Sequence, residues 1–214
     1  MHFVFDGIFP DPSLADEDGL LAVGGDLHPQ TILNAYHIGA YPWYNEENPI
    51  LWWCPNPRLV LFPAEIKVSK SMKQLLKKGQ FSFTLNQNFE AVIEACRQNR
   101  TNQDGTWISQ EILEAYTQMH YLGYAHSVEV WLNNELVGGF YGIQLGKVFF
   151  GESMFSKISN ASKSALIYFC LHALQEGIEV IDCQQTTAHL ISMGAREISR
   201  QDFLLLLDKF VKAD

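Results

Sequence analysis

Apolar and polar residues along the chain group into segments of the length of single helices and strands. The stretch 28–39 has Pro29 near its start and Gly39 just past its end, a placement typical of a short helix. Residues 40–63 follow and are rich in proline, which disfavours long regular structure. We expect the aromatic rings of this segment to pack on another element or to line a pocket.

Two amphipathic helices are predicted within residues 65–98, with a short strand over 81–85 between them. At about 100° per residue, the apolar side chains of the first helix fall on one arc and five lysines fall on the opposite arc. The apolar arc holds Val68, Met72, Leu75 and Leu76. The lysine arc holds Lys67, Lys70, Lys73, Lys77 and Lys78.

Helix caps and turn residues become clearer after residue 105. Ser109 is the expected N-cap of a helix over 110–122, which Gly123 ends. The pattern over 126–155 predicts three antiparallel strands with turns at "NN" and "QLGK". Asn160 is the expected cap of the apolar helix that follows.

The last quarter of the chain contains a buried strand over 178–183 and a short helix over 186–194. Ser199 and Asp202 form a predicted capping box for a final amphipathic helix. This order of elements predicts an α+β protein. The polar stretch 98–106 is the expected boundary between an N-terminal domain, 1–100, and a C-terminal domain, 101–214.

Composition narrows the class of protein. The chain has 214 residues with 47% hydrophobic residues, enough to bury a core without disulfides or metal. Its four cysteines lie far apart, without the spacing of a zinc site, so we expect reduced and mostly buried thiols and no metal. No signal peptide or membrane-spanning run is apparent, which predicts a cytoplasmic protein.

The formal net charge of −9 argues against indiscriminate nucleic-acid binding, because a polyanion is repelled by such a surface on average. A nucleic-acid site would have to be a local basic patch. The lysine arc is the candidate, since no acidic residue interrupts it between Lys67 and Lys78. The alternative is an ordinary solvated helix face.

Polar side chains begin where two apolar strands end. Asp182 and Gln184 follow the strand that starts at residue 178, and Glu152 follows an apolar strand as well. Ligands bind at strand ends in open sheets, so these residues are candidates for a site. The alternatives are a helix cap for Asp182 and a salt bridge at the rim for Glu152.

The second half resembles the core of the GNAT acyltransferases in its order of meander, helix, buried strand and short helix. Shorter motifs make a more specific match: "GLLAVGGDL", "AYPWY", "PILWWCPNPR", "DGTWIS", "AHSVEVW", "LVGGFYGI", "FFGESMFS", "NASKSAL", "IDCQ" and "HLISMGA". In this order they resemble the leucyl/phenylalanyl-tRNA–protein transferase family over nearly the whole chain. The resemblance implies a GNAT-like catalytic domain, with an antiparallel meander, splayed strands and helices, behind a smaller N-terminal α/β domain. It also implies transfer of Leu or Phe from Leu-tRNA or Phe-tRNA to the N-terminal Lys or Arg of a protein, which marks that protein for degradation.

The resemblance assigns roles to the strand-end residues. Asp182 and Gln184 match the catalytic pair, with Gln184 beside the attacking amine. We expect Gln184 to accept a hydrogen bond from the amine, and Asp182 to fix the Gln184 amide and to add negative potential. Glu152 matches the acid near the aminoacyl group, where it would pair either with the aminoacyl ammonium or with the Lys or Arg of the acceptor.

The same match implies an apolar aminoacyl pocket of Phe140, Phe149, Met154 and Phe169. It places Tyr36, Trp43, Trp107 and Tyr116 at the terminal adenosine. Aromatic rings in strands and helices are more often core residues, which is the alternative for both sets. The lysine arc would carry tRNA phosphates.

No cofactor is expected, because the aminoacyl ester is already activated. Acetyl-CoA is disfavoured since residues 152–176 lack the glycines of a pyrophosphate loop. The rival hypotheses are a non-catalytic module that binds aminoacyl-tRNA or N-terminal degradation signals and, less favoured, an acetyl-CoA-dependent N-acetyltransferase. We expect a monomer.

Overall fold

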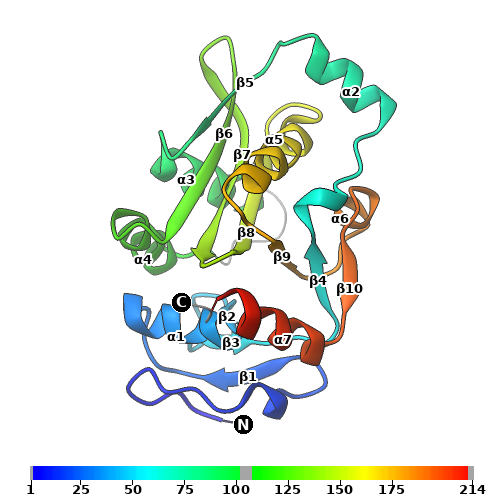
Figure 1. Ribbon diagram of the computed structural model, residues 1–214. Helices are drawn as coiled ribbons and strands as arrows, with labels where there is room; N and C mark the ends of the chain where they lie inside the picture. The colour runs from blue at the N-terminus through cyan, green and yellow to red at the C-terminus, as the bar shows by residue number, and fades with distance from the viewer. Residues whose placement is uncertain (1, 102–107, 212–214) are drawn as a thin grey trace.

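The computed structural model describes residues 2–101 and 108–211, which form two β-sheets with helices around them (Figure 1). The smaller sheet has the strand order β1-β3-β2 and the larger one has the order β10-β4-β9-β8-β7-β6-β5. The strands are β1 (Leu20–Val23), β2 (Tyr41–Pro42), β3 (Leu51–Trp53), β4 (Arg58–Leu61), β5 (Ser82–Leu85), β6 (Ala125–Leu132), β7 (Glu135–Leu145), β8 (Val148–Ser156), β9 (Val180–Gln184) and β10 (Arg196–Ile198). The helices are α1 (Pro29–His37), α2 (Lys70–Lys77), α3 (Phe89–Thr101), α4 (Gln110–Tyr121), α5 (Ala161–Gln175), α6 (Ala188–Ser192) and α7 (Arg200–Phe210). The α+β class predicted from the sequence is therefore confirmed.

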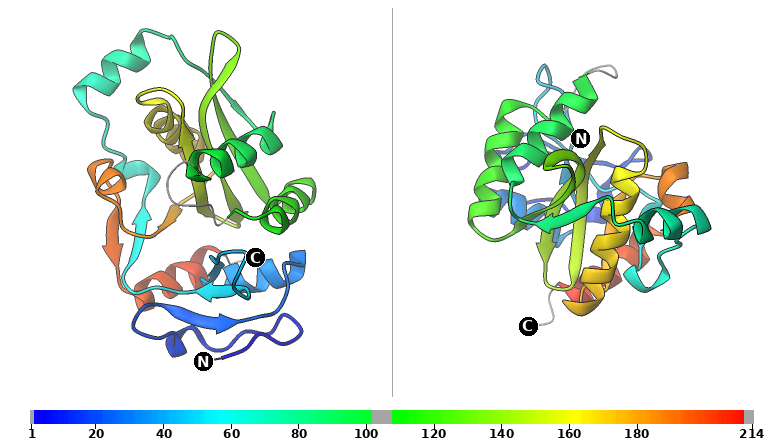
Figure 2. Two further views of the ribbon diagram at one scale, coloured as in Figure 1. Left: turned by 180° about the vertical axis from the view of Figure 1, so that it is seen from behind. Right: turned by 90° about the horizontal axis from the view of Figure 1, so that it is seen from above.

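Helices cover both faces of the larger sheet (Figure 2). Alternation along β8 sends Phe150 to the core that includes α3 and α4, and sends Phe149 to the core that includes α5. β6, β7 and β8 form the predicted antiparallel meander. The GNAT-like order of meander, helix and following strand is present.

β8 and β9 are parallel but pair only between Val148–Phe150 and Val180–Asp182. β8 continues to Ser156, whereas β9 pairs on its other edge with β4. The two strands therefore separate directly after Asp182. This divergence leaves a gap between strands within the sheet, next to the polar strand ends.

The proline-rich segment forms only the short strands β2, β3 and β4, as its composition predicts. Trp52 is fully buried and packs edge-on against Phe9. The larger sheet takes β4 and β5 from the first hundred residues. The division of the chain near residue 100 stays a prediction.

Two helix starts differ from those predicted, and a third agrees. Helix α2 begins at Lys70 behind the N-cap Ser69, so Lys67 and Val68 precede it and do not belong to its faces. Asn160 occupies the N-cap position of α5 in a left-handed conformation, but its side chain makes no capping hydrogen bond. At α7, Ser199 Oγ does accept from the Asp202 amide, as a cap should.

Candidate functional site

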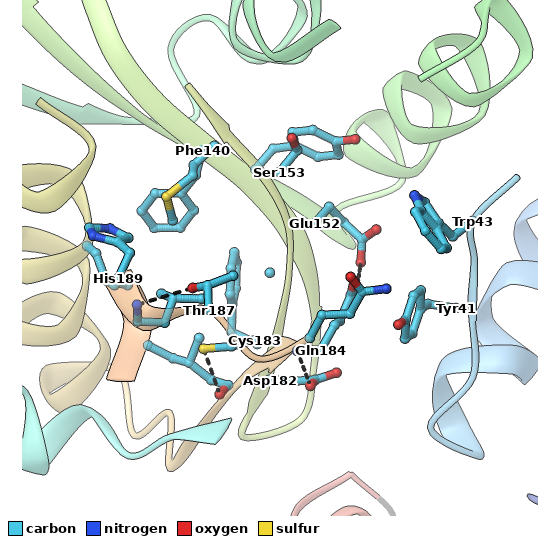
Figure 3. Close-up of a pocket in the computed structure, with 18 residues that line it drawn as sticks. Tyr41, Trp43, Phe140, Glu152, Ser153, Asp182, Cys183, Gln184, Thr187 and His189 are labelled. Atoms are coloured by element: carbon cyan, nitrogen blue, oxygen red, sulfur yellow. Dashed lines mark hydrogen bonds between the residues drawn. The ribbon is translucent and has the colours of Figure 1, made fainter. Parts of the chain in front are cut away.

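A cavity of about 330 Å³ opens where β8 and β9 separate (Figure 3). One wall comes from β7 and β8, a second from β9 and the start of α6, and the third from Tyr41 and Trp43 beside the smaller sheet. Glu152, Asp182 and Gln184 all line it. The three polar residues singled out in the sequence therefore meet at one cavity, although Glu152 lies inside β8 at a register shift and does not follow the strand as predicted.

Two β-bulges aim the polar side chains at this cavity. On β8, Tyr141 pairs with Ser153 and Gly142 pairs with Gly151, so Glu152 is the additional, unpaired residue. On β9, a second register shift separates the pairs of Asp182 and Gln184. Gln184 has a φ of 61°, a left-handed conformation that is uncommon for a residue other than glycine. Such conformations persist only where the surrounding structure holds them in place, and they cluster at functional sites.

Gln184 and Glu152 are hydrogen-bonded across the gap between the strands. Gln184 Nε2 donates to Glu152 Oε1 over 2.8 Å. An ionised carboxylate can accept hydrogen bonds but cannot donate them, so the amide nitrogen of Gln184 faces Glu152. The amide oxygen of Gln184 therefore remains as an acceptor. That oxygen is suited to bind an N–H group of a ligand.

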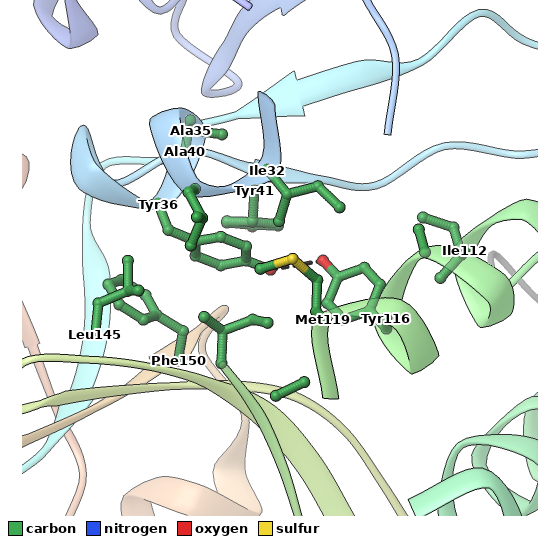
Figure 4. Close-up of a cluster of buried hydrophobic side chains, with 14 of the residues drawn as sticks. Ile32, Ala35, Tyr36, Ala40, Tyr41, Ile112, Tyr116, Met119, Leu145 and Phe150 are labelled. Atoms are coloured by element: carbon green, nitrogen blue, oxygen red, sulfur yellow. Dashed lines mark hydrogen bonds between the residues drawn. The ribbon is translucent and has the colours of Figure 1, made fainter. Parts of the chain in front are cut away.

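Two buried tyrosines, Tyr36 and Tyr116, hold the other side of Glu152, and Figure 4 shows their two hydroxyls meeting. Tyr36 on α1 donates to Glu152 Oε1 over 2.6 Å, and its hydroxyl lies 2.6 Å from that of Tyr116 on α4. Burial raises the pKa of both tyrosines well above the ordinary value, so they remain donors at neutral pH. Glu152 Oε2 has only a 3.4 Å contact with the Tyr116 hydroxyl and is the less engaged oxygen.

Burial also raises the pKa of Glu152 to about 7, against the opposing effect of its hydrogen bond from Tyr36. The nearby Asp182 adds to the rise, while the hydrogen bonds from Gln184 and Tyr116 oppose it. Glu152 therefore changes charge near neutral pH. A cation bound beside Oε2 would favour the ionised form.

Asp182 has a different environment from the one predicted. Its carboxylate is fully buried and accepts from Arg58 Nε over 2.8 Å and from Arg58 Nη2 over 2.6 Å. It also accepts the backbone N–H of Gln184 over 2.9 Å. The prediction that Asp182 fixes the side-chain amide of Gln184 is wrong, since Glu152 holds that amide. Removing one partner of such a buried pair typically costs about 3–5 kcal/mol, because the other charge is left unpaired.

The far part of the cavity is apolar. Phe140, Phe149 and Met154 line it, together with Leu166 and Leu190. The ring of Phe169 lies 5.3 Å from that of Phe140 and 4.5 Å from that of Phe149. Phe169 is not among the lining residues and supports the two rings from behind.

Comparison with known proteins supplies the family. A family model described as leucyl/phenylalanyl-tRNA protein transferase matches residues 60–208, and the model of that family's N-terminal domain matches residues 25–56. The chain is 55% identical over 210 residues to a leucyl/phenylalanyl-tRNA–protein transferase of Hydrogenovibrio crunogenus, covering 97% of this chain and 82% of the relative. The protein of that name from Flavobacterium johnsoniae is 53% identical, with 97% of this chain and 99% of the relative covered.

This chain belongs to the leucyl/phenylalanyl-tRNA–protein transferase family. It is an aminoacyltransferase, with an aminoacyl-tRNA as donor and a protein as acceptor. Among solved structures it is similar to a conserved protein of unknown function from Bacteroides thetaiotaomicron, with a TM-score of 0.47, 12% identity, and 71% of this chain and 55% of the other covered. It is also similar to a GCN5-related N-acetyltransferase from Kribbella flavida, with a TM-score of 0.40, 9% identity, and coverage of 80% and 61%.

The residues expected at the terminal adenosine lie in different places in the transferase. Trp43 lines the cavity with 39% of its surface exposed, and Trp53 fixes it by donating to its carbonyl oxygen. Tyr36 and Tyr116 are fully buried, do not line the cavity, and face Glu152 instead. Trp107 lies outside the described residues.

In the transferase, the lysines of the run from Lys67 to Lys78 are exposed but do not border the cavity. Lys67 precedes α2, and its backbone N–H donates to Met193 just after α6, which does border the cavity. The lysine run therefore starts next to a cavity wall. The described lysines of this run are Lys67, Lys70, Lys73, Lys77 and Lys78.

A covalent role for the cavity's cysteine is disfavoured. Burial raises the pKa of the Cys183 thiol, and the neighbouring Asp182 adds to the rise. The thiol donates to the carbonyl oxygen of Ile181 over 3.8 Å. Because the thiolate is the nucleophilic form, Cys183 is poorly suited to carry an acyl group.

Sequence reasoning missed several residues of the site. Arg58, Tyr41 and His189 were given no role, although Tyr41 and His189 line the cavity and Arg58 binds Asp182. The motif "PNPR" contained Arg58 but not the information that its partner lies 124 residues later.

Within residues 2–101 and 108–211, no group of three or more His, Cys, Asp or Glu side chains could hold a metal ion. None of the described helices is both long and apolar enough to cross a membrane.

Proposed function

We propose that this transferase moves Leu or Phe from aminoacyl-tRNA to the N-terminal Lys or Arg of an acceptor protein, and that the product is a degradation signal. The observation that carries the proposal is the cavity between β8 and β9, which joins an apolar end to the polar pair of Gln184 and Glu152. A large apolar side chain and an amine are the two groups that the reaction must bring together.

The apolar end accounts for the donor. Leu or Phe would enter between Phe140, Phe149 and Met154, with burial contributing about 0.8 kcal/mol for each CH₂. Small aminoacyl groups would leave part of this space unfilled. The exposed ring of Trp43 at the opposite end would stack on the terminal adenosine, since every base offers a face to an aromatic ring.

The polar end accounts for the acceptor. The α-amine of the acceptor attacks the ester carbon, the new C–N bond forms, and the bond from that carbon to the ribose oxygen breaks. Gln184 Oε1 accepts an N–H of the amine and orients its lone pair. An amide oxygen is too weakly basic to retain the proton, which passes to the leaving ribose oxygen directly or through water.

Glu152 provides the negative charge of the site. Its less engaged Oε2 would bind either the aminoacyl ammonium or the cationic side chain of the acceptor, which would explain a preference for Lys or Arg. Catalysis then consists chiefly of holding the two reactants together, because the ester is already activated. The chemistry assigned to these side chains requires no cofactor.

The exposed lysines from Lys67 to Lys78 would bind tRNA phosphates beside the cavity. Such contacts are independent of base sequence, which suits a protein that must accept Leu-tRNA and Phe-tRNA. The monomeric state and the cytoplasmic location stay predictions from the sequence.

Transfer assays with a panel of peptides test the proposal. Labelled Leu-tRNA is incubated with the transferase and peptides that begin with Arg, Lys, Ala or acetylated Arg. Label on the Arg and Lys peptides alone is the expected result. Equal labelling of the Ala peptide would contradict the acceptor preference, and no labelling of any peptide would contradict the donor assignment.

A further inference from the structure

Arg58 is a fully buried charged residue whose partner, Asp182, lines the cavity. Its guanidinium carbon lies 4.8 Å from the ring centre of Tyr41 and 4.5 Å from that of Phe203. Tyr41 belongs to β2 of the smaller sheet and Phe203 to α7. The guanidinium is thus held between a ring from each of two elements outside the larger sheet.

The only charged partner of Arg58 among the described residues is Asp182 on β9. Two parallel hydrogen bonds join them, from Nε to Oδ1 and from Nη2 to Oδ2. This bidentate geometry fixes the plane of the carboxylate as well as its position. The positive charge of Arg58 also offsets part of the negative charge of Asp182.

The same carboxylate controls the backbone of the next functional residue. Asp182 Oδ1 accepts both from Arg58 Nε and from the backbone N–H of Gln184. Gln184 is in the left-handed region, and in this conformation its side chain donates to Glu152. A rotation of the Asp182 carboxylate would remove the acceptor that holds the Gln184 backbone.

We propose that Arg58 is a positioning residue for the transfer reaction: by clamping Asp182, it holds Gln184 in the left-handed conformation that presents its side-chain amide to Glu152 and to the attacking amine. This inference rests on the proposed function. It gives Asp182 the role of a neutralised anchor whose effect reaches the amine through Gln184. It also makes turnover depend on Tyr41 and Phe203, whose rings hold the guanidinium.

A double-substitution experiment separates an anchor from a charge that acts on the substrate. Asp182→Asn keeps an oxygen for the Gln184 N–H but leaves Arg58 buried without a counter-charge, and kcat should fall about 100-fold. Arg58→Met removes the other half of the clamp with an apolar chain of similar length, and kcat should fall about as far. Because either substitution alone breaks the clamp, the double variant should be about as slow as Asp182→Asn, with the KM for Leu-tRNA unchanged. A folded double variant whose loss is the product of the two single losses, or whose kcat returns to the wild-type value, would overturn the proposal.

Arg58→Lys provides a second test if the double variant does not fold. An ammonium retains the charge but cannot form the two parallel bonds, so kcat should fall about tenfold while the KM for Leu-tRNA stays constant. An unchanged kcat would overturn the proposal, because bidentate clamping would then be unnecessary.

Hydrogen exchange at the Gln184 backbone amide tests the clamp without turnover. Arg58→Lys should speed this exchange at least about tenfold, since the amide loses its fixed acceptor. An unchanged exchange rate would contradict the inference. Absence of transfer by the wild-type protein on every peptide would instead contradict the proposed function, so the two failures are distinguishable.

Discussion

The side-chain amide of Gln184 donates a 2.8 Å hydrogen bond to Glu152 Oε1 and so joins β9 to β8 beyond the last pair of residues that the two strands share. This bond defines the polar end of the cavity. It turns the Gln184 carbonyl oxygen toward an incoming donor and leaves Glu152 Oε2 available for a cation. Four predictions follow from the residues on either side of it and from the surfaces next to it.

The first prediction concerns the charge of Glu152. Its pKa is raised from 4.5 to about 7, so the folded protein binds this proton more tightly than the unfolded chain does. The contribution of Glu152 to stability is therefore most favourable below pH 4.5 and is lost as the pH rises to about 7. The Glu152→Gln variant has no carboxyl group at this position and does not suffer this loss. Its free energy of unfolding minus that of the wild type should therefore rise by about 3 kcal/mol as the pH rises from 4.5 to about 7, at about 1.36 kcal/mol per pH unit.

Urea unfolding of both proteins at pH 4.5, 6 and 7.5 measures this difference. Effects of the other carboxyl groups cancel because both proteins carry them. The lost or rearranged hydrogen bonds of the Gln side chain add an offset that does not change with pH. A stability difference that is the same at all three pH values would contradict the raised pKa.

The second prediction concerns the aminoacyl pocket. Met154→Ala shortens a lining side chain without disturbing the packed rings of Phe140, Phe149 and Phe169, and should lower kcat/KM for Leu-tRNA by about tenfold. Met154→Leu approximately conserves volume and serves as the control, with kcat/KM near that of the wild type. Steady-state transfer assays measure both. Equal activity of the Ala and Leu variants would show that Met154 does not contact the aminoacyl side chain.

The third prediction concerns the lysine run. Lys73→Glu combined with Lys77→Glu should weaken tRNA binding and lower the slope of log K against log salt by about two, roughly one for each lost phosphate contact. Lys147→Glu combined with Lys209→Glu makes the same change in net charge at exposed lysines of the β7–β8 turn and α7. Fluorescence titrations at several salt concentrations compare the two. Identical slopes for both double variants would assign the α2 lysines to a solvated face.

The elements of the fold were largely predictable from the sequence because local signals specify them. Pro29 and Gly39 bracket α1, Ser109 caps α4, and alternating apolar residues give β6, β7 and β8. The predicted cap at Asn160 forms no capping hydrogen bond, because a suitable residue type at the N-cap does not ensure one.

The site was predictable only in part. Polar residues that follow apolar runs pointed to Glu152, Asp182 and Gln184, and all three line the cavity, although Glu152 lies within β8. Their mutual contacts depend on two β-bulges and on the left-handed Gln184, which no periodicity encodes. The partnership of Arg58 with Asp182 is a contact between residues distant in sequence, and the pattern of a single sequence contains no signal for it.

The fourth prediction tests the central claim, that Gln184 orients the attacking amine in a preassembled site. The measurement is single-turnover transfer of labelled Leu from Leu-tRNA to a peptide beginning with Arg, by the wild type and by Gln184→Ala, with Gln175→Ala at the exposed end of α5 as control. We predict a rate about 100-fold lower for Gln184→Ala with unchanged tRNA affinity, and a wild-type rate for Gln175→Ala. A folded Gln184→Ala variant that transfers Leu at the wild-type rate would contradict the account.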